Sequence, residues 1–162
     1  MRSKSSEPSS PEQAYHYALK LLASRDYTTL KLKRKLLDRQ FSEADTEGVV
    51  LRLLAEGWLN DRRFAERFAE EALTSGRFAG PRLRLEMRRR GIPAELITEV
   101  VGQMRDEHDE DEGLRSLFER RFPGFSFATA TDREKRRVLG FLQRRGFSIG
   151  AIRGVMRDRS GE

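Results

Sequence analysis

The sequence contains no cysteine, and its only two histidines, His16 and His108, lie far apart. The lack of thiols excludes disulfides, thiolate nucleophiles and cysteine-ligated metals, and it fits a cytoplasmic protein. Neither histidine belongs to a metal-ligand spacing such as H-x-x-x-H. Gly76 and Gly80 lead into Pro81 without the Lys-Ser or Lys-Thr pair of a phosphate-binding P-loop. We therefore expect no enzyme, no cofactor and no metal site.

Long apolar runs are missing as well. No run approaches the roughly 18 residues needed to cross a bilayer, so we expect no membrane contact. Hydrophobic residues make up 37% of the chain and charged residues 36%, which means that apolar side chains must lie on narrow helical stripes to build a core. The net charge of +6 favours polyanions or acidic protein surfaces as partners.

The sequence repeats itself. Segments centred on Phe41, Ile92 and Phe147 can be overlaid without gaps for about 25 residues, with anchor spacings of 51 and 55. Apolar residues recur on one helical face before each anchor. They are Leu32, Leu83 and Val138, nine residues before, and Leu36, Met87 and Leu142, five residues before.

A tight corner follows the middle helix of each copy. Gly91 and Gly146 directly precede their anchors and suit the left-handed residue that closes a helix. Ser42, Pro93 and Ser148 directly follow the anchors and favour the start of a new helix. With a further helical stretch upstream of each pair, the sequence predicts an all-α fold of three tandem three-helix repeats, similar in plan to a helix-turn-helix. The predicted segments are a disordered tail at 1–11, repeats at 12–59, 60–104 and 105–158, and a short tail at 159–162.

Basic side chains concentrate on the middle helix of each predicted repeat. On any one helix the simpler interpretation is a solvated outer face. Recurrence in three copies favours contact with a repetitive polyanion or an acidic filament groove. The candidate binding residues are Lys31, Lys33, Arg34 and Lys35, then Arg82, Arg84, Arg88, Arg89 and Arg90, then Arg136, Arg137, Arg144 and Arg145.

The roles of the aromatic residues and of the basic strips each allow more than one interpretation. Trp58, the only tryptophan, is expected to pack between modules, with contact to a partner as the alternative. Phe122, Phe125 and Phe127 either join the core or form an exposed aromatic loop. Sequence-specific DNA reading by a helix-turn-helix is disfavoured because the third helices carry few arginines. A helical scaffold whose basic strips only keep it soluble is the weaker alternative.

The chain resembles the RecX family over residues 14–158. The motifs that carry the resemblance are AYHYALKLLASR, with Ala14, Ala18, Leu21, Leu22 and Arg25; GWLNDRRFA, with Leu59, Asp61, Arg63, Phe64 and Ala65; the Gly80 turn; and RRGI and RRGF at Gly91 and Gly146. Lys31 and Thr46 depart from the usual pattern of the family in the first repeat.

This resemblance implies an elongated, curved molecule that regulates, and usually inhibits, the recombinase and ATPase activity of RecA by binding the RecA–DNA filament. Some members of the family also bind DNA, so single- or double-stranded DNA is a further candidate partner. The family has no catalytic triad to carry over. The alternative function is a non-specific DNA-binding helical module without RecA contact. No long heptad pattern is present, so we expect a monomer.

Overall fold

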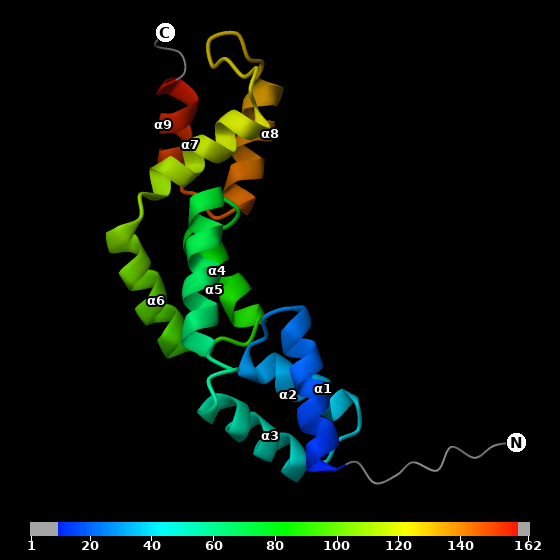
Figure 1. Cartoon of the computed structure of the whole chain (residues 1–162). Helices are drawn as coiled ribbons and strands as arrows, with labels where there is room; N and C mark the ends of the chain where they lie inside the picture. Colours follow the sequence, from blue (N-terminus) through cyan, green and yellow to red (C-terminus); the bar gives the residue numbers. More distant parts are fainter. Residues whose placement is uncertain (1–9, 159–162) are drawn as a thin grey trace, which may run out of the picture. The chain divides into compact units, whose positions relative to one another are not determined.

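The computed structural model describes residues 10–158 and shows nine α-helices and no β-strand in that range (Figure 1). The prediction of an all-helical chain with three helices per repeat is confirmed. The predicted tail at 159–162 lies outside the described residues, as does the tail at 1–11 except for Ser10 and Pro11. The helices are α1 (Pro11–Ser24), α2 (Thr29–Asp38), α3 (Glu43–Ala55), α4 (Asp61–Ser75), α5 (Gly80–Arg89), α6 (Ala94–Glu107), α7 (Glu110–Arg121), α8 (Asp132–Arg144) and α9 (Ile149–Asp158).

Side-chain caps fix where several of these helices begin. Ser10 accepts a hydrogen bond from the backbone N–H of Gln13, and the Gln13 side chain bonds back, which completes a capping box at the start of α1. Ser42 caps α3, and Asn60 accepts from the backbone N–H of Arg63 at 2.9 Å. The cap supplied by Asn60 leaves Asp61 available for another contact, described below.

The predicted corners adopt the expected left-handed backbone. Gly91 has a φ of 86° and Gly146 a φ of 103°, and Gln40, at the equivalent place in the first repeat, has a φ of 69°. Gly146 is also constrained by space, because a Cβ there would lie 1.9 Å from the carbonyl oxygen of Ala79. The backbone N–H of Ala79 donates to the carbonyl of Arg145 at 2.8 Å, which holds the two segments at this close approach.

Contacts divide the described chain into two compact units. The first comprises residues 10–64 together with Arg90–Ile92, and it contains α1, α2 and α3. Its apolar core is formed by the inward faces of these three helices, by Tyr27 between α1 and α2, and by Leu59 after α3. The buried members are Ala14, Ala18, Tyr27, Leu32, Leu36, Val49, Val50, Leu53 and Leu59.

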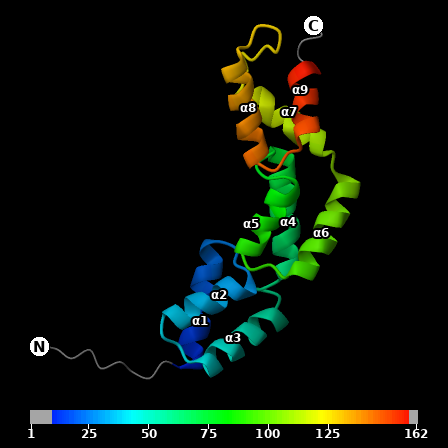
Figure 2. The same cartoon turned by 180° about the vertical axis from the view of Figure 1, so that it is seen from behind.

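The second unit comprises residues 65–89 and 93–158. Within it, α9 packs against both α7 and α8 (Figure 2). The core at this end consists of Ala79, Leu114, Leu117, Phe118, Val138, Leu142, Phe147, Ile152, Val155 and Met156. The spacing of Val138 and Leu142 on α8 is the four-residue spacing of one helical face, as the sequence overlay predicts.

Trp58 does not belong to the core of the first unit, since its side chain is 57% exposed. Leu59 takes the core position instead and is 2% exposed. The outer face of α3 carries two further apolar side chains, Leu51 and Leu54, at 59% and 41% exposure. These residues point outward because Val50 and Leu53 already fill the inner face of α3.

The aromatic loop after α7 is intermediate between the two predicted alternatives. Phe122, Phe125 and Phe127 are each half-buried and pack against the core of the third repeat. The ring of Phe125 meets that of Phe118 edge to face, with centroids 5.6 Å apart. The loop is therefore anchored on the core while part of each ring stays accessible.

Candidate anion-binding grooves

The structure confirms that most of the candidate basic residues belong to the middle helix of their repeat. Those of the first repeat lie on α2, and those of the second and third lie on α5 and α8 with two exceptions. Arg90 follows the end of α5, and Arg145 is the C-cap of α8. The structure separates the candidates into groups with different surroundings, so they do not form one uniform strip.

In the first unit, four of the candidates line a groove of about 480 Å³. They are Lys31, Arg34, Lys35 and Arg90, and Arg25 joins them as a fifth cation. Two carboxylates, Asp26 and Asp38, also line the groove, together with Tyr27, Thr28 and Phe64. Five cations against two carboxylates make this groove attractive to anions.

Backbone contacts place Arg90 beside α2. The Thr28 hydroxyl donates to the carbonyl oxygen of Arg90, and the backbone N–H of Thr29 donates to Oδ1 of Asp61 at 2.8 Å. Gly91 is needed here, because a Cβ would lie 2.8 Å from a side-chain carbon of Leu30. The segment 90–92 is thereby fastened to the start of α2, which brings Arg90 to the groove.

Lys33, the remaining candidate on α2, has a different role. Its Nζ lies 2.5 Å from Oε2 of Glu47 on α3, so its charge is used to join two helices of the first unit. The prediction grouped it with Lys31, Arg34 and Lys35, but it faces another side of α2 and does not line the groove. A helix turns about 100° per residue, and this rotation separates neighbours in the basic run.

In the second repeat, a buried carboxylate binds two of the candidates. Glu86 is 7% exposed, and its Oε1 lies 2.9 Å from an Arg82 nitrogen and 3.1 Å from an Arg89 nitrogen. The side chains of Arg82 and Arg89 are 38% and 58% exposed. Arg88 is exposed and Arg84 is half-buried. On α5, therefore, an internal anion already neutralises part of the basic face.

In the third repeat, two of the candidates line a groove of about 520 Å³. These are Arg137 and Arg144, and the groove also contains Arg121 at the end of α7. Gly124, Glu134 and Val138 line it, as do the rings of Phe122, Phe125 and Phe141. Arg136 is exposed outside the groove. The Arg145 side chain donates to the Arg77 carbonyl at 3.3 Å and lies 5.0 Å from the ring centroid of Phe141.

The groove of the first unit, the Glu86 ion network and the groove of the third repeat lie at equivalent positions of the repeat. In the gapless overlay, Lys31, Arg82 and Arg137 coincide. The positions four and seven residues further along the helix also coincide, and all three lie on one helical face. Their occupants in the first, second and third repeats are Lys35, Glu86 and Phe141, then Asp38, Arg89 and Arg144.

The sequence reasoning missed the other lining residues. Arg25, Tyr27, Arg121 and Phe141 were not among the candidates. The overlay of the repeats contains the signal, since it aligns Phe141 with Lys35 and Glu86. The pattern of basic residues does not indicate these positions, because the grooves combine cations with aromatic side chains.

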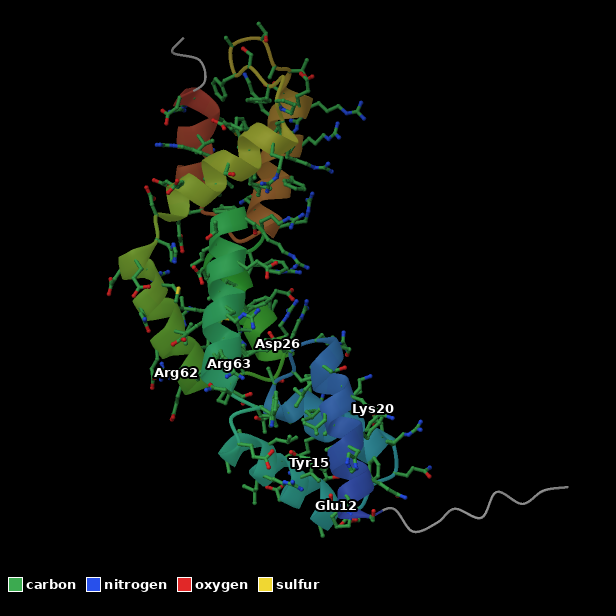
Figure 3. The ribbon with its side chains drawn as sticks, viewed as in Figure 1. Glu12, Tyr15, Lys20, Asp26, Arg62 and Arg63 are labelled. Carbon is green, nitrogen blue, oxygen red and sulfur yellow. The ribbon has the colours of Figure 1, made fainter. Side chains whose placement is uncertain are left out.

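A separate polar network joins α1, which carries Tyr15 (Figure 3), to α3 in the first unit. The Tyr15 hydroxyl donates to Oε2 of Glu56 at 2.6 Å, and Arg52 lies 2.9 Å from the other oxygen. The Arg52 guanidinium is 3.6 Å from the Tyr15 ring centroid. Hydrogen bonds from Tyr15 and Arg52 lower the pKa of Glu56, while the bond to Glu56 raises the pKa of Tyr15. This network holds two helices together and is not part of either groove.

The chemistry of these grooves is that of binding. Within residues 10–158, no group of three or more His, Cys, Asp or Glu side chains is arranged to hold a metal ion. No helix in the same range is long and apolar enough to cross a membrane. Guanidinium and ammonium groups beside aromatic rings recognise phosphates, carboxylates and flat ring systems.

Comparisons with known proteins identify the repeats. Models of the first, second and third three-helix domains of RecX match residues 14–53, 60–101 and 109–156. The chain is 46% identical over 143 residues to the regulatory protein RecX of Trichlorobacter lovleyi, covering 88% of this chain and 93% of that relative. It is 39% identical over 139 residues to the regulatory protein RecX of Thermus thermophilus, covering 85% and 86%.

A crystal structure of RecX from Lactobacillus salivarius has the same fold. It superposes with a TM-score of 0.70 at 17% identity, covering 91% of this chain and 95% of that chain. Matches to all three domain models and to relatives over most of their length thus agree with the helical architecture. The chain belongs to the RecX family of regulatory proteins and is not an enzyme.

Proposed function

We propose that this protein acts in the cytoplasm as a regulator of RecA, and that it inhibits recombinase and ATPase activity by binding the RecA–DNA filament. Membership of the RecX family supports a regulatory role. The groove of the first unit is the observation that assigns the contact to particular residues. Its lining includes five cations, which are Arg25, Lys31, Arg34, Lys35 and Arg90.

The groove of the first unit suits an acidic protein segment. Its cations come from the end of α1, from α2 and from the segment after α5, so they surround a ligand instead of forming one row. Tyr27 contributes an apolar floor and is 8% exposed. A carboxylate with an adjoining apolar stem would meet both kinds of lining, because charge-assisted hydrogen bonds fix the head group while the aromatic side chain covers the stem.

The proposal is tested by titrating the protein into RecA, ATP and single-stranded DNA while ATP hydrolysis is followed. Replacing Arg34 and Lys35 together by glutamate should raise the concentration for half-inhibition by about tenfold or more, since each lost charge-assisted contact is worth roughly 1.5–3 kcal/mol. Lys20→Glu is the matched control, because Lys20 is exposed on α1 and does not line the groove (Figure 3).

Two outcomes would contradict the proposal. Wild-type protein that leaves ATP hydrolysis unchanged would reject RecA regulation. Equal weakening by the Lys20 variant and the groove variant would reject this groove as the contact surface. Circular dichroism on each variant checks that its helices are retained.

A further inference from the structure

The groove of the third repeat contains a combination that the proposed RecA contact does not use. Arg121, Arg137 and Arg144 supply three guanidinium groups, and Phe122, Phe125 and Phe141 supply three rings. The volume of about 520 Å³ lies within the range of roughly 300–1,000 Å³ that is usual for small-molecule sites. The size and the lining are therefore those of a site for a ligand of nucleotide size.

The only carboxylate in the lining is already engaged. Oε2 of Glu134 accepts hydrogen bonds from the backbone N–H of Thr131 at 2.7 Å and from its hydroxyl at 2.9 Å. These bonds form the capping box of α8 and lower the pKa of Glu134. The charge of Glu134 thus serves the start of the helix, and the three arginines remain the dominant charges of the groove.

In the second repeat, the positions equivalent to those of Arg137, Phe141 and Arg144 hold an internal ion network. There Arg82 and Arg89 occupy the positions of Arg137 and Arg144, and both reach the carboxylate of Glu86, which stands at the position of Phe141. An oxyanion between two arginines is thus part of this chain's own architecture. In the third repeat phenylalanine replaces the internal carboxylate, which leaves the place of the oxyanion to an external ligand.

The rings indicate what else that ligand carries. Phe122 meets Phe141 edge to face with centroids 5.5 Å apart, and Arg121 lies 5.4 Å from the Phe141 centroid. Phe122 and Phe125 are half-buried, so each keeps part of its ring accessible in the groove. Aromatic rings beside arginines along an open groove are the lining on which unpaired bases stack while the cations hold the phosphates.

We propose that the groove of the third repeat binds one nucleotide of a single-stranded nucleic acid, with the phosphate at Arg137 and Arg144 and the base against Phe122 and Phe125. A paired base is not accessible to such stacking, which favours a single strand over a duplex. The inference does not depend on contact with RecA, so it can be tested without RecA and can fail or hold independently of the proposed function.

The test is fluorescence anisotropy of a labelled deoxythymidine oligonucleotide titrated with the full-length protein. Arg137→Ala and Arg144→Ala should each weaken binding by about tenfold, because each removes a charge-assisted contact with phosphate. Arg133→Ala is the matched control. It removes the same charge from the same helix, and Arg133 is exposed outside the groove.

A second variant copies the arrangement of the second repeat. Phe141→Glu introduces a carboxylate between Arg137 and Arg144, as Glu86 lies between Arg82 and Arg89. It should reduce binding of the oligonucleotide at least as much as either arginine variant. Thermal unfolding monitored by circular dichroism checks that the variant is folded, and if it is not, the two arginine variants still decide the question.

The ligand itself identifies the chemistry. An abasic strand of equal length should bind about tenfold more weakly than the thymidine strand, because base stacking on aromatic side chains contributes roughly 1–3 kcal/mol per base. The proposal is overturned if the thymidine strand does not bind, if the abasic strand binds equally well, or if Arg133→Ala weakens binding as much as Arg137→Ala. It is also overturned if a polyglutamate peptide displaces the strand at a lower concentration than unlabelled thymidine strand does.

Discussion

Tyr15, Arg52 and Glu56 link the first and third helices of the first unit, and their titration gives a prediction at the scale of single residues. The pKa of Glu56 is lowered mainly by the hydrogen bond from Tyr15. A carboxylate whose pKa is lower in the folded state stabilises the fold above its unfolded value of 4.5, and this stabilisation is lost as the pH falls through the folded value.

We therefore expect Tyr15→Phe to lower the melting temperature at pH 7 and to lower it less at a pH well below 4.5. Protonation of Glu56 already weakens the network there in the wild-type protein. Thermal unfolding of both proteins across this pH range measures the difference. Tyr17→Phe is a control, since Tyr17 contacts Phe41 and Arg39 outside this network. A constant difference at all pH values would show that the Tyr15 hydroxyl acts independently of the Glu56 charge.

Gly146 gives a second prediction at this scale. Its φ of 103° and the carbonyl of Ala79, 1.9 Å from where a Cβ would stand, both oppose a side chain. Gly146→Ala should lower the free energy of unfolding by more than about 1 kcal/mol, because it adds a steric conflict to an unfavourable backbone conformation. Gly154→Ala should instead be neutral or stabilising by up to about 1 kcal/mol, as Gly154 lies in α9 with no atom within 4 Å of the added methyl group. Urea unfolding of the two variants measures both values.

At the scale of the elements, the helices of the described part could be predicted from the sequence because their signals are local. The four-residue spacing of Leu32 and Leu36 indicates a helix face, and Ser10 and Gly146 mark a helix start and a corner within a few residues of each. These signals need no knowledge of tertiary packing. The same locality explains why the repeat overlay gave the correct number of helices in each copy.

Features that depend on packing could not be predicted in the same way. Whether Trp58 or Leu59 enters the core depends on which side of the chain the rest of the unit covers. The sequence alone does not show which of two adjacent apolar residues will be buried. Glu86 was visible in the overlay, but only side-chain geometry shows that one carboxylate reaches both Arg82 and Arg89. The basic face of α5 is consequently less available than its sequence indicates.

The ion network of α5 leads to a prediction about this element. Glu86→Gln removes the carboxylate that neutralises Arg82 and Arg89, so the variant should unfold more easily by roughly 1–3 kcal/mol. The two arginines should at the same time become available to external anions, and binding to polyanions such as heparin should tighten. Glu119→Gln makes the same charge change at an exposed position on α7 and should alter neither property by a comparable amount. Unchanged heparin affinity in Glu86→Gln would show that the two arginines are not limited by their internal partner.

The same network decides which of the candidate residues Arg88, Arg89 and Arg90 can be tested cleanly by charge reversal. Arg89 pairs with Glu86, so replacing it by glutamate would place two carboxylates together and confuse loss of binding with loss of stability. Arg88→Glu alone avoids this problem because Arg88 is exposed. It should weaken inhibition of RecA ATP hydrolysis without changing helicity, and full inhibition by this variant would exclude Arg88 from the contact surface.

At the scale of the whole molecule, the two grooves differ in chemistry although they occupy equivalent places in their repeats. The first combines five cations with two carboxylates and the rings of Tyr27 and Phe64, and the third combines three arginines with three phenyl rings and the single carboxylate of Glu134. A net charge of +6 alone would give one diffuse attraction to any polyanion. Distinct linings instead predict distinct ligands, an acidic protein segment in the first groove and an unpaired nucleotide in the third.

Measuring each groove variant in both the RecA assay and the strand-binding assay tests whether the two grooves have distinct ligands. The Arg34→Glu, Lys35→Glu variant should lose inhibition of RecA while keeping most of its affinity for the thymidine strand, whereas Arg137→Ala should lose strand affinity while inhibition changes less. In a protein carrying all three substitutions, the free-energy changes should add within about 0.5 kcal/mol in each assay, because the grooves share no lining residue. If every variant instead weakened both activities in proportion to the charge removed, and added salt weakened them in parallel, the grooves would be parts of one non-specific polyanion surface. The alternative of a DNA-binding module that competes with RecA for the strand would then explain the inhibition better than contact with the filament.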